Sequence, residues 1–139
     1  MSPPPYRHLK ERTEQGVLVL TLTDAQIRGD QLAEELAHEL HDAIARTAAP
    51  RVVLDLGGVA FLSTVAFRPL LFVHKQVKDL GGRVVLCGLQ PAVAEVLHLT
   101  RLLSSSRTYQ APFEEQPDMA AAVVSLSRSE EHTSELQSR

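Results

Sequence analysis

Three short apolar segments, separated by segments with helical periodicity, restrict this chain to an α/β fold. The apolar segments are VLVLTLTD (17–24), RVVLDLGG (51–58) and RVVLCGL (83–89). Between the first two, QLAEELAHELHDAIAR (31–46) places Leu or Ile at every fourth residue from Leu32 to Ile44, which predicts a helix with one apolar stripe. Strands that alternate with helices in this way form a largely parallel sheet with right-handed crossovers.

The remaining segments extend this alternating order at both ends. YRHLKERT (6–13) is expected to pair with the strand at 17–24 as an antiparallel hairpin, with EQG as the turn. Asp30 is expected to cap the first helix. A second helix is expected from about residue 66 to 80, with Gly81 and Gly82 at its C-terminal cap. A third begins at Pro91, SSSRTYQAPF is expected to be a loop with a short strand, and DMAAAVVSL a last helix.

The expected fold is therefore one small α/β domain. Its sheet is mixed, mostly parallel and built from four to five strands, and about four helices flank it. A chain of 139 residues suits one such core. We expect residues 1–5, with three prolines, to be a disordered lead-in and residues 6–127 to form the domain.

The last twelve residues, RSEEHTSELQSR (128–139), show no apolar periodicity. The string resembles the translation of a sequencing adapter, so we expect a non-native tail and a native C-terminus that is missing; a native disordered tail is the alternative. The net charge of −3 does not favour nucleic acid or an anionic membrane as a partner. No apolar run approaches the roughly 20 residues of a membrane span. With a single cysteine and no signal-peptide pattern, we expect a cytoplasmic protein.

The segment FLSTVAF (61–67) places two hydroxyls, Ser63 and Thr64, in an apolar run. Polar groups in such a place need partners or a purpose. Neither lies in G-x-S-x-G, and no histidine has a spacing that ties it to Ser63, so serine hydrolysis is disfavoured. At the start of a helix, a hydroxyl is most often a cap.

Other residues that carry chemistry also fail to form a catalytic or metal pattern. His38 and His41 lie three residues apart on one helix, but no further ligands complete a metal site. Gly57 and Gly58 belong to no phosphate-binding motif, and a tight turn explains both. Asp55 lacks the acidic pair of a receiver domain. We therefore expect no enzymatic activity, no cofactor and no metal.

Two segments resemble the STAS family, which includes the bacterial anti-sigma-factor antagonists. VVLDLGGVAFLSTVAFRPLL (52–71) is similar to the central signature of the family, and LGGRVVLCGLQPAVAEVLHLTRL (80–102) is similar to a later one. The resemblance covers about residues 6–126. It implies a small mixed sheet flanked by helices.

In the antagonists, a Ser or Thr at the start of the helix after the central strand is phosphorylated by a serine kinase, which is also the anti-sigma factor. The unphosphorylated antagonist binds this kinase. By resemblance the acceptor falls on Thr64, with Ser63 as the alternative. The family's Asp before the acceptor falls on Ser63, its Gly two residues later on Ala66, and a loop Asp on Arg28. Pro69 should make the helix start late, near Ala66, or kink its first turn.

The resemblance implies a non-enzymatic, cytoplasmic module that binds an anti-sigma factor serine/threonine kinase and is switched off by phosphorylation. The alternative is a STAS scaffold or transporter-associated regulatory subunit that is never phosphorylated. Weak homodimerisation is the only self-association expected. The residues expected at the partner surface are Asp24, Arg28, Gly58, Ser63, Thr64, Val65, Ala66, Phe67 and Arg68.

Overall fold

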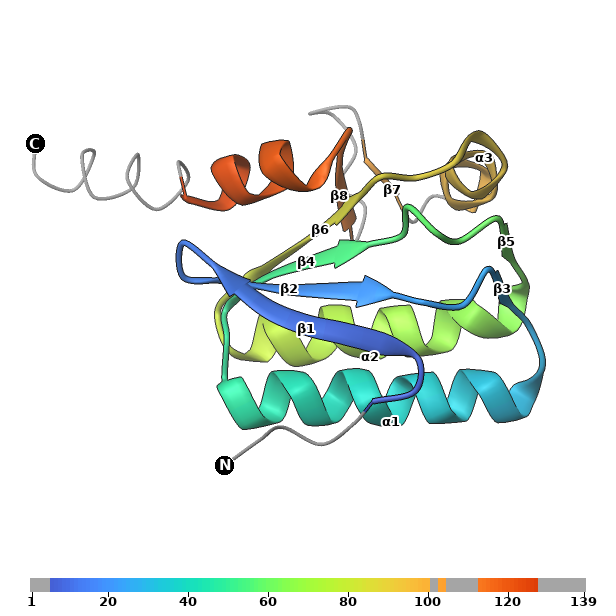
Figure 1. Cartoon of the computed structure of the whole chain (residues 1–139), viewed down its shortest axis with the longest axis horizontal. Helices are drawn as coiled ribbons and strands as arrows, with labels where there is room; N and C mark the ends of the chain where they lie inside the picture. The colour runs from blue at the N-terminus through green and yellow to red at the C-terminus, as the bar shows by residue number, and fades with distance from the viewer. Residues whose placement is uncertain (1–5, 101–102, 105–112, 128–139) are drawn as a thin grey trace, which may run out of the picture.

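A six-stranded mixed sheet lies at the centre of the computed structural model, which describes residues 6–100, 103–104 and 113–127 (Figure 1). The strands follow the order β1-β2-β4-β6-β8-β7, and β1 alone among them runs antiparallel to its neighbour. The α/β class and the mixed, mostly parallel sheet are confirmed. Five strands form the body of the sheet, and the two-residue β7 adds a sixth at the edge. Their bounds are β1 (Leu9–Glu14), β2 (Val17–Leu22), β4 (Arg51–Asp55), β6 (Arg83–Cys87), β7 (Leu103–Ser104) and β8 (Phe113–Gln116).

The hairpin at the start of the chain is closed by a turn that needs positive φ angles. Glu14 pairs with Val17, and the two residues between them, Gln15 and Gly16, have φ angles of 51° and 78°. Two consecutive residues with positive φ match the right-handed twist of the paired strands. The predicted hairpin and its turn are confirmed.

Two helices, α1 (Asp30–Thr47) and α2 (Phe67–Asp79), cover one face of the sheet side by side (Figure 1). The leucine stripe of α1 supplies Leu36 and Leu40, which are buried against alternate strand residues such as Leu20 and Leu54. The third helix, α3 (Pro91–Leu99), begins with the proline and adds Val93 and Leu97 to the same core. The larger core therefore lies between the sheet and these helices.

A helix over residues 119–127 covers the other face of the sheet. Its Ala122, Val123 and Leu126 pack with the opposite-facing strand residues, including Val19 and Val53. The central strands β2, β4 and β6 are therefore buried on both faces, which explains their nearly continuous apolar sequences. Within the described residues, no helix is long and apolar enough to cross a membrane.

Two local features differ from the sequence expectation. Gly29, with a φ of 87°, occupies the N-cap of α1, and Asp30 is the first helical residue, where its charge still faces the positive end of the helix dipole. Two short strands, β3 (Gln26–Ile27) and β5 (Phe61–Leu62), form a second sheet that the sequence did not indicate. The expectations for residues 1–5 and 128–139 lie outside the described residues, as does most of the loop at 104–113.

Candidate functional site

The strand pair β3–β5 brings the loop after β2 and the segment FLSTVAF to one end of the molecule (Figure 1). The N–H groups of Ala60 and Phe61 donate to the carbonyl of Ala25 at 2.7 and 3.2 Å, and the N–H of Ser63 donates to the carbonyl of Ile27 at 2.9 Å. These bonds continue the parallel register, so Arg28 follows directly beside Ser63. Asp24 and Arg28 in the first segment, and Gly58 and residues 63–68 in or beside the second, all expected at the partner surface, therefore lie at one end of the molecule.

Ser63 and Thr64 occupy different environments despite being adjacent. Thr64 is exposed and is the first residue of a 3-10 turn, Thr64–Ala66. Ser63 has an extended backbone at the N-cap, and its carbonyl accepts the N–H of Ala66 at 3.0 Å. The Oγ of Ser63 makes no capping bond; it is buried and has no hydrogen-bond partner among the described residues. Only the Thr64 hydroxyl is therefore open to another protein.

Pro69 fits the first turn of α2 without a kink. The helix begins at Phe67, after the 3-10 turn, so Pro69 is its third residue. The N–H groups of the first turn lack intrahelical acceptors, and a residue without an N–H costs no bond there. This late start is the first of the two possibilities that the sequence left open.

The other residues expected at the partner surface divide into exposed and buried ones. Arg28, Gly58 and Arg68 are exposed, and Val65 is partly exposed. Ala66 is completely buried, so its side chain cannot touch a partner directly. Phe67 is partly buried and packs against the larger core. The fully exposed part of the predicted surface therefore consists of Arg28, Gly58, Thr64 and Arg68, with Asp24, Val65 and Phe67 partly accessible.

Asp24 lies at the same end but is already engaged by His8. The His8 Nδ1 is 2.7 Å from Asp24 Oδ2, and the His8 Nε2 is 2.8 Å from Glu35 Oε1. A neutral imidazole has one N–H, so only the protonated ring can donate to both carboxylates. Burial by itself lowers the pKa of His8, but the hydrogen bonds to Glu35 and Asp24 outweigh it and leave that pKa raised. The bond to His8 lowers the pKa of Glu35. His8 thus ties the loop after β2 to α1, and its two carboxylate partners favour the protonated ring.

The Gly57–Gly58 turn is closed by bonds within the chain. Asp55 Oδ1 accepts the N–H of Gly57 at 2.9 Å, and Gln90 Nε2 donates to the carbonyl of Gly57 at 3.0 Å. This matches the tight turn predicted from the sequence. Asp55 holds the turn with its carboxylate.

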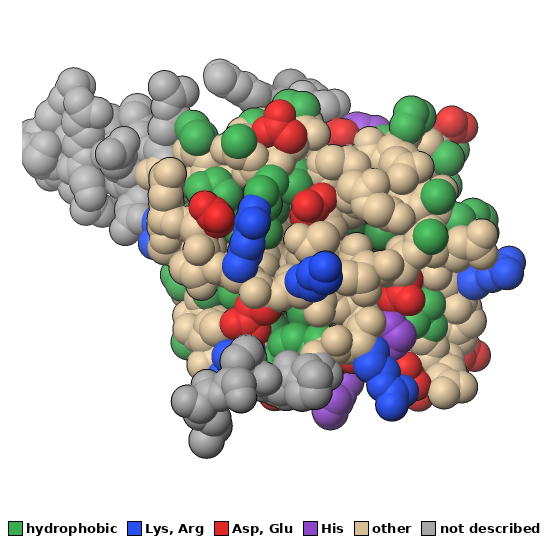
Figure 2. Space-filling view, in the orientation of Figure 1, with side chains coloured by type: hydrophobic (Ala, Val, Ile, Leu, Met, Phe, Trp, Pro, Cys, Tyr) green, Lys and Arg blue, Asp and Glu red, His purple; other side chains and the backbone are tan. Residues whose placement is uncertain are grey.

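His38 and His41 are both exposed on α1, and no group of three or more potential ligands lies together in the part of the chain that the structure describes. Cys87 is buried, as expected for a core thiol, and burial raises its pKa to about 12, helped by the Asp55 and Asp118 carboxylates. On the face shown in Figure 2, acidic and basic side chains are interspersed and form no continuous basic patch.

The family model of the STAS domain matches residues 8–114 of the chain. The chain belongs to the STAS domain family. The resemblance noted in the two sequence segments is confirmed, and the match falls within the expected domain at residues 6–127.

Relatives of this STAS domain include anti-sigma factor antagonists. It is 40% identical over 91 residues to BtrV of Bordetella bronchiseptica, whose name describes an anti-sigma factor antagonist; the match covers 64% of this chain and 74% of BtrV. A crystal structure of an anti-sigma factor antagonist from Mycobacterium paratuberculosis has a TM-score of 0.68 at 22% identity, covering 86% of this chain and 92% of that one. The phosphorylated form of the Bacillus protein SpoIIAA has a TM-score of 0.52 at 14% identity, covering 66% and 82%. The two structures share the fold of this STAS domain.

Sequence reasoning missed two features near the site of this STAS domain. Phe61, on β5, is 46% exposed beside the Thr64 turn. A groove also runs between α1 and α2 from the end that carries Thr64. The exposed face of α2 contains Phe72 among charged residues, and this interruption of a polar face was the available sequence signal for the groove.

Proposed function

We propose that this STAS domain is an anti-sigma factor antagonist that binds an anti-sigma serine kinase through the surface around Thr64, and that phosphorylation of Thr64 ends this binding. The observation that carries the proposal is the contrast between the exposed Thr64 and the buried hydroxyl of Ser63. In this proposal the domain acts by binding, catalyses no reaction and works in the cytoplasm, where a sigma factor acts.

The position of Thr64 allows the fold to tolerate a phosphate. The start of a helix presents N–H groups without intrahelical partners, which favour an anion. A phosphate adds a charge of about −1.5 to −2, and the helix dipole compensates roughly 0.3–1 kcal/mol of its cost. Arg28, which follows β3 beside Ser63, supplies a nearby positive charge. Phosphorylation should therefore leave the domain folded.

The same phosphate is poorly tolerated in an interface that is complementary to a neutral hydroxyl. Placing its charge against a like charge costs several kcal/mol, and each ~1.4 kcal/mol is a tenfold loss of affinity. One phosphate is therefore sufficient to dissociate a micromolar complex. The name of BtrV supports the antagonist role, and the phosphorylated form of SpoIIAA, which shares the fold, supports a switch of this kind.

The proposal departs from the antagonist pattern in the charge of the neighbouring loop. Arg28 stands where the pattern has an Asp, and it is exposed. The kinase surface that meets this loop should therefore carry an acidic group opposite Arg28. In other antagonists the same part of the kinase faces an Asp. Arg28→Asp should weaken binding to the cognate kinase by at least about tenfold through like-charge contact.

The test uses a purified anti-sigma serine kinase from the same genome, with Mg-ATP and intact-protein mass spectrometry. We expect the mass increase of one phosphate on the wild type and on Ser63→Ala, and none on Thr64→Ala. Thr13→Ala removes another exposed threonine, on β1, and serves as the matched control. Phosphate on the Thr64→Ala variant would refute the acceptor assignment.

Binding is measured separately by titrating the kinase with each variant. Thr64→Glu should weaken binding by more than about tenfold, whereas Thr13→Glu should leave it unchanged. Tight binding to a kinase that never modifies the chain would instead favour the STAS subunit that is not phosphorylated.

A further inference from the structure

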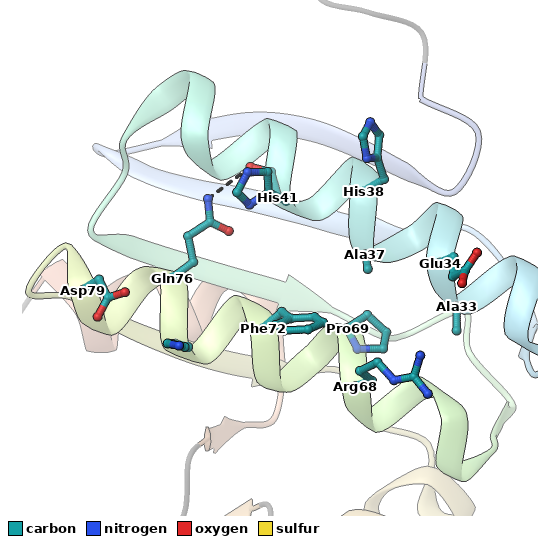
Figure 3. Close-up of a pocket in the computed structure, with 11 residues that line it drawn as sticks. Ala33, Glu34, Ala37, His38, His41, Arg68, Pro69, Phe72, Gln76 and Asp79 are labelled. Atoms are coloured by element: carbon teal, nitrogen blue, oxygen red, sulfur yellow. Dashed lines mark hydrogen bonds between the residues drawn. The ribbon is translucent and has the colours of Figure 1, made fainter.

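The groove between α1 and α2 has one well exposed apolar side chain, Phe72, above small side chains that are buried or partly buried. Its volume is about 680 Å³, and Ala33, Ala37 and Pro69 line it (Figure 3). Phe72 projects from α2 beside them and is 56% exposed. An aromatic ring above small side chains is a typical anchor point of an interface.

The charges beside this groove on α2 have a symmetric arrangement. Arg68, Phe72, Lys75 and Asp79 follow at spacings of four, three and four residues, which places them on one face of the helix. None of the three charged residues forms an ion pair with a residue that the structure describes. The pair Arg68 and Asp79 is centred between residues 73 and 74. The pair Phe72 and Lys75 has the same centre.

We propose that the face formed by α1 and α2 binds a second copy of this chain, with the two copies of α2 antiparallel about a two-fold axis near residues 73 and 74. In this arrangement Arg68 meets Asp79 of the second copy, and Phe72 meets its Lys75. Each contact occurs twice, as a two-fold interface requires. The first is an ion pair between opposite charges, and the second places an ammonium over an aromatic ring.

The exposed face of α1 repeats this pattern. Glu34 and His41 are equally distant from the midpoint between Ala37 and His38, so Glu34 meets His41 of the second copy. The small side chain of Ala37 at the centre permits close approach of the two helices. Gln76 Nε2 donates to the carbonyl of His41 at 3.1 Å, so Gln76 of α2 lies at about the same height along the helix axes as His41 of α1 (Figure 3). When the two helices are aligned in this way, the centre of the α2 pattern and the centre of the α1 pattern differ by about one residue, or ~1.5 Å along the helix axis.

Charge complementarity is what selects a second copy as the occupant. An unrelated partner helix would require no mirror order of opposite charges along α2, where Arg68 and Asp79 stand at equal distances from the centre. The proposed contacts are few and lie between exposed charged side chains, which contribute little each, so the dimer should be weak. It does not depend on the proposed kinase binding, because both partners are this chain.

The test is sedimentation equilibrium of the full chain from roughly 10 μM to 1 mM, the range in which small interfaces dissociate. We expect wild-type dimerisation that weakens with added salt. Arg68→Glu and Asp79→Arg should each weaken it by at least about tenfold, because each places like charges together twice. The double variant Arg68→Glu/Asp79→Arg should restore it, because the pairs re-form with reversed sign.

Lys78→Glu is the matched control. It makes the same change of charge as Arg68→Glu on the same helix, outside the groove, and should leave the dimer intact. Circular dichroism verifies that each variant is folded. A wild type that stays monomeric throughout, or a double variant no better than the single ones, would overturn the proposal. No kinase is present, so the outcome is independent of the proposed function.

Discussion

Two adjacent glycines after α2 are expected to respond very differently to alanine. Gly81 has a φ of 77°, and its N–H donates to the carbonyl of Lys78 at 2.9 Å, while the N–H of Gly82 donates to the carbonyl of Val77 at 2.9 Å. These bonds form a Schellman cap. A Cβ on Gly81 would meet nothing within 4 Å, but a Cβ on Gly82 would lie 1.7 Å from the carbonyl oxygen of Pro50.

The cost of Gly82→Ala follows from what must move. The carbonyl carbon and Cα of Pro50 would also lie within 2.7 Å of the new Cβ, so a backbone segment, and not a flexible side chain, has to retreat by more than about 1 Å. The Pro50 carbonyl accepts the N–H of Arg83 at 2.8 Å where β4 and β6 begin. Losing this bond costs about 1–3 kcal/mol, and disturbing the packing beside it about 1–3 kcal/mol more.

We therefore expect Gly82→Ala to lower the free energy of unfolding by about 2–6 kcal/mol, out of a typical 5–15 kcal/mol. Gly81→Ala has only the backbone strain of a positive φ, about 1–2 kcal/mol. Urea denaturation followed by circular dichroism measures both variants against the wild type. If Gly82→Ala proved no more destabilising than Gly81→Ala, the close approach of Pro50 to this turn would be refuted.

Two further predictions concern titratable groups. The folded-state pKa of His8 is raised and that of Glu35 is lowered, so their contact should stabilise the domain most at pH values between the two. The stabilisation should be lost in acid as Glu35 takes up a proton, and in alkali as His8 loses one. His8→Gln should cost about 1 kcal/mol near neutral pH and flatten the alkaline side of a urea-based pH profile; an unchanged profile would contradict the contact. Cys87, with a pKa of about 12 and no exposed surface, should resist iodoacetamide at pH 8 until denaturant unfolds the chain; rapid labelling of the folded domain would contradict its burial.

The main elements were predictable because their signals are local. The apolar stripe of α1 and the continuous apolar sequences of β4 and β6 each lie within a single segment, so periodicity identifies them without knowledge of the rest of the chain. The family signatures then indicated which strand-to-helix turn carries the candidate site. The positions of these elements relative to one another followed from the handedness of parallel connections.

The pair β3–β5 was not predictable in the same way. Each strand has two residues, too few to show any period, and their bonds join segments that are far apart in the sequence. The cap of α1 was also misplaced, because Gly29 adopts a positive φ that a side-chain rule does not reveal, and Asp30 therefore enters the helix.

The difference between Ser63 and Thr64 depends on this unpredicted strand pair. The bond from the N–H of Ser63 to the carbonyl of Ile27 extends the β3–β5 ladder by one residue and holds Ser63 extended. The 3-10 turn can then begin only at Thr64. In this extended position the Oγ of Ser63 is directed into the protein and Thr64 remains exposed. A two-residue strand thus determines which of two adjacent hydroxyls is exposed at the surface.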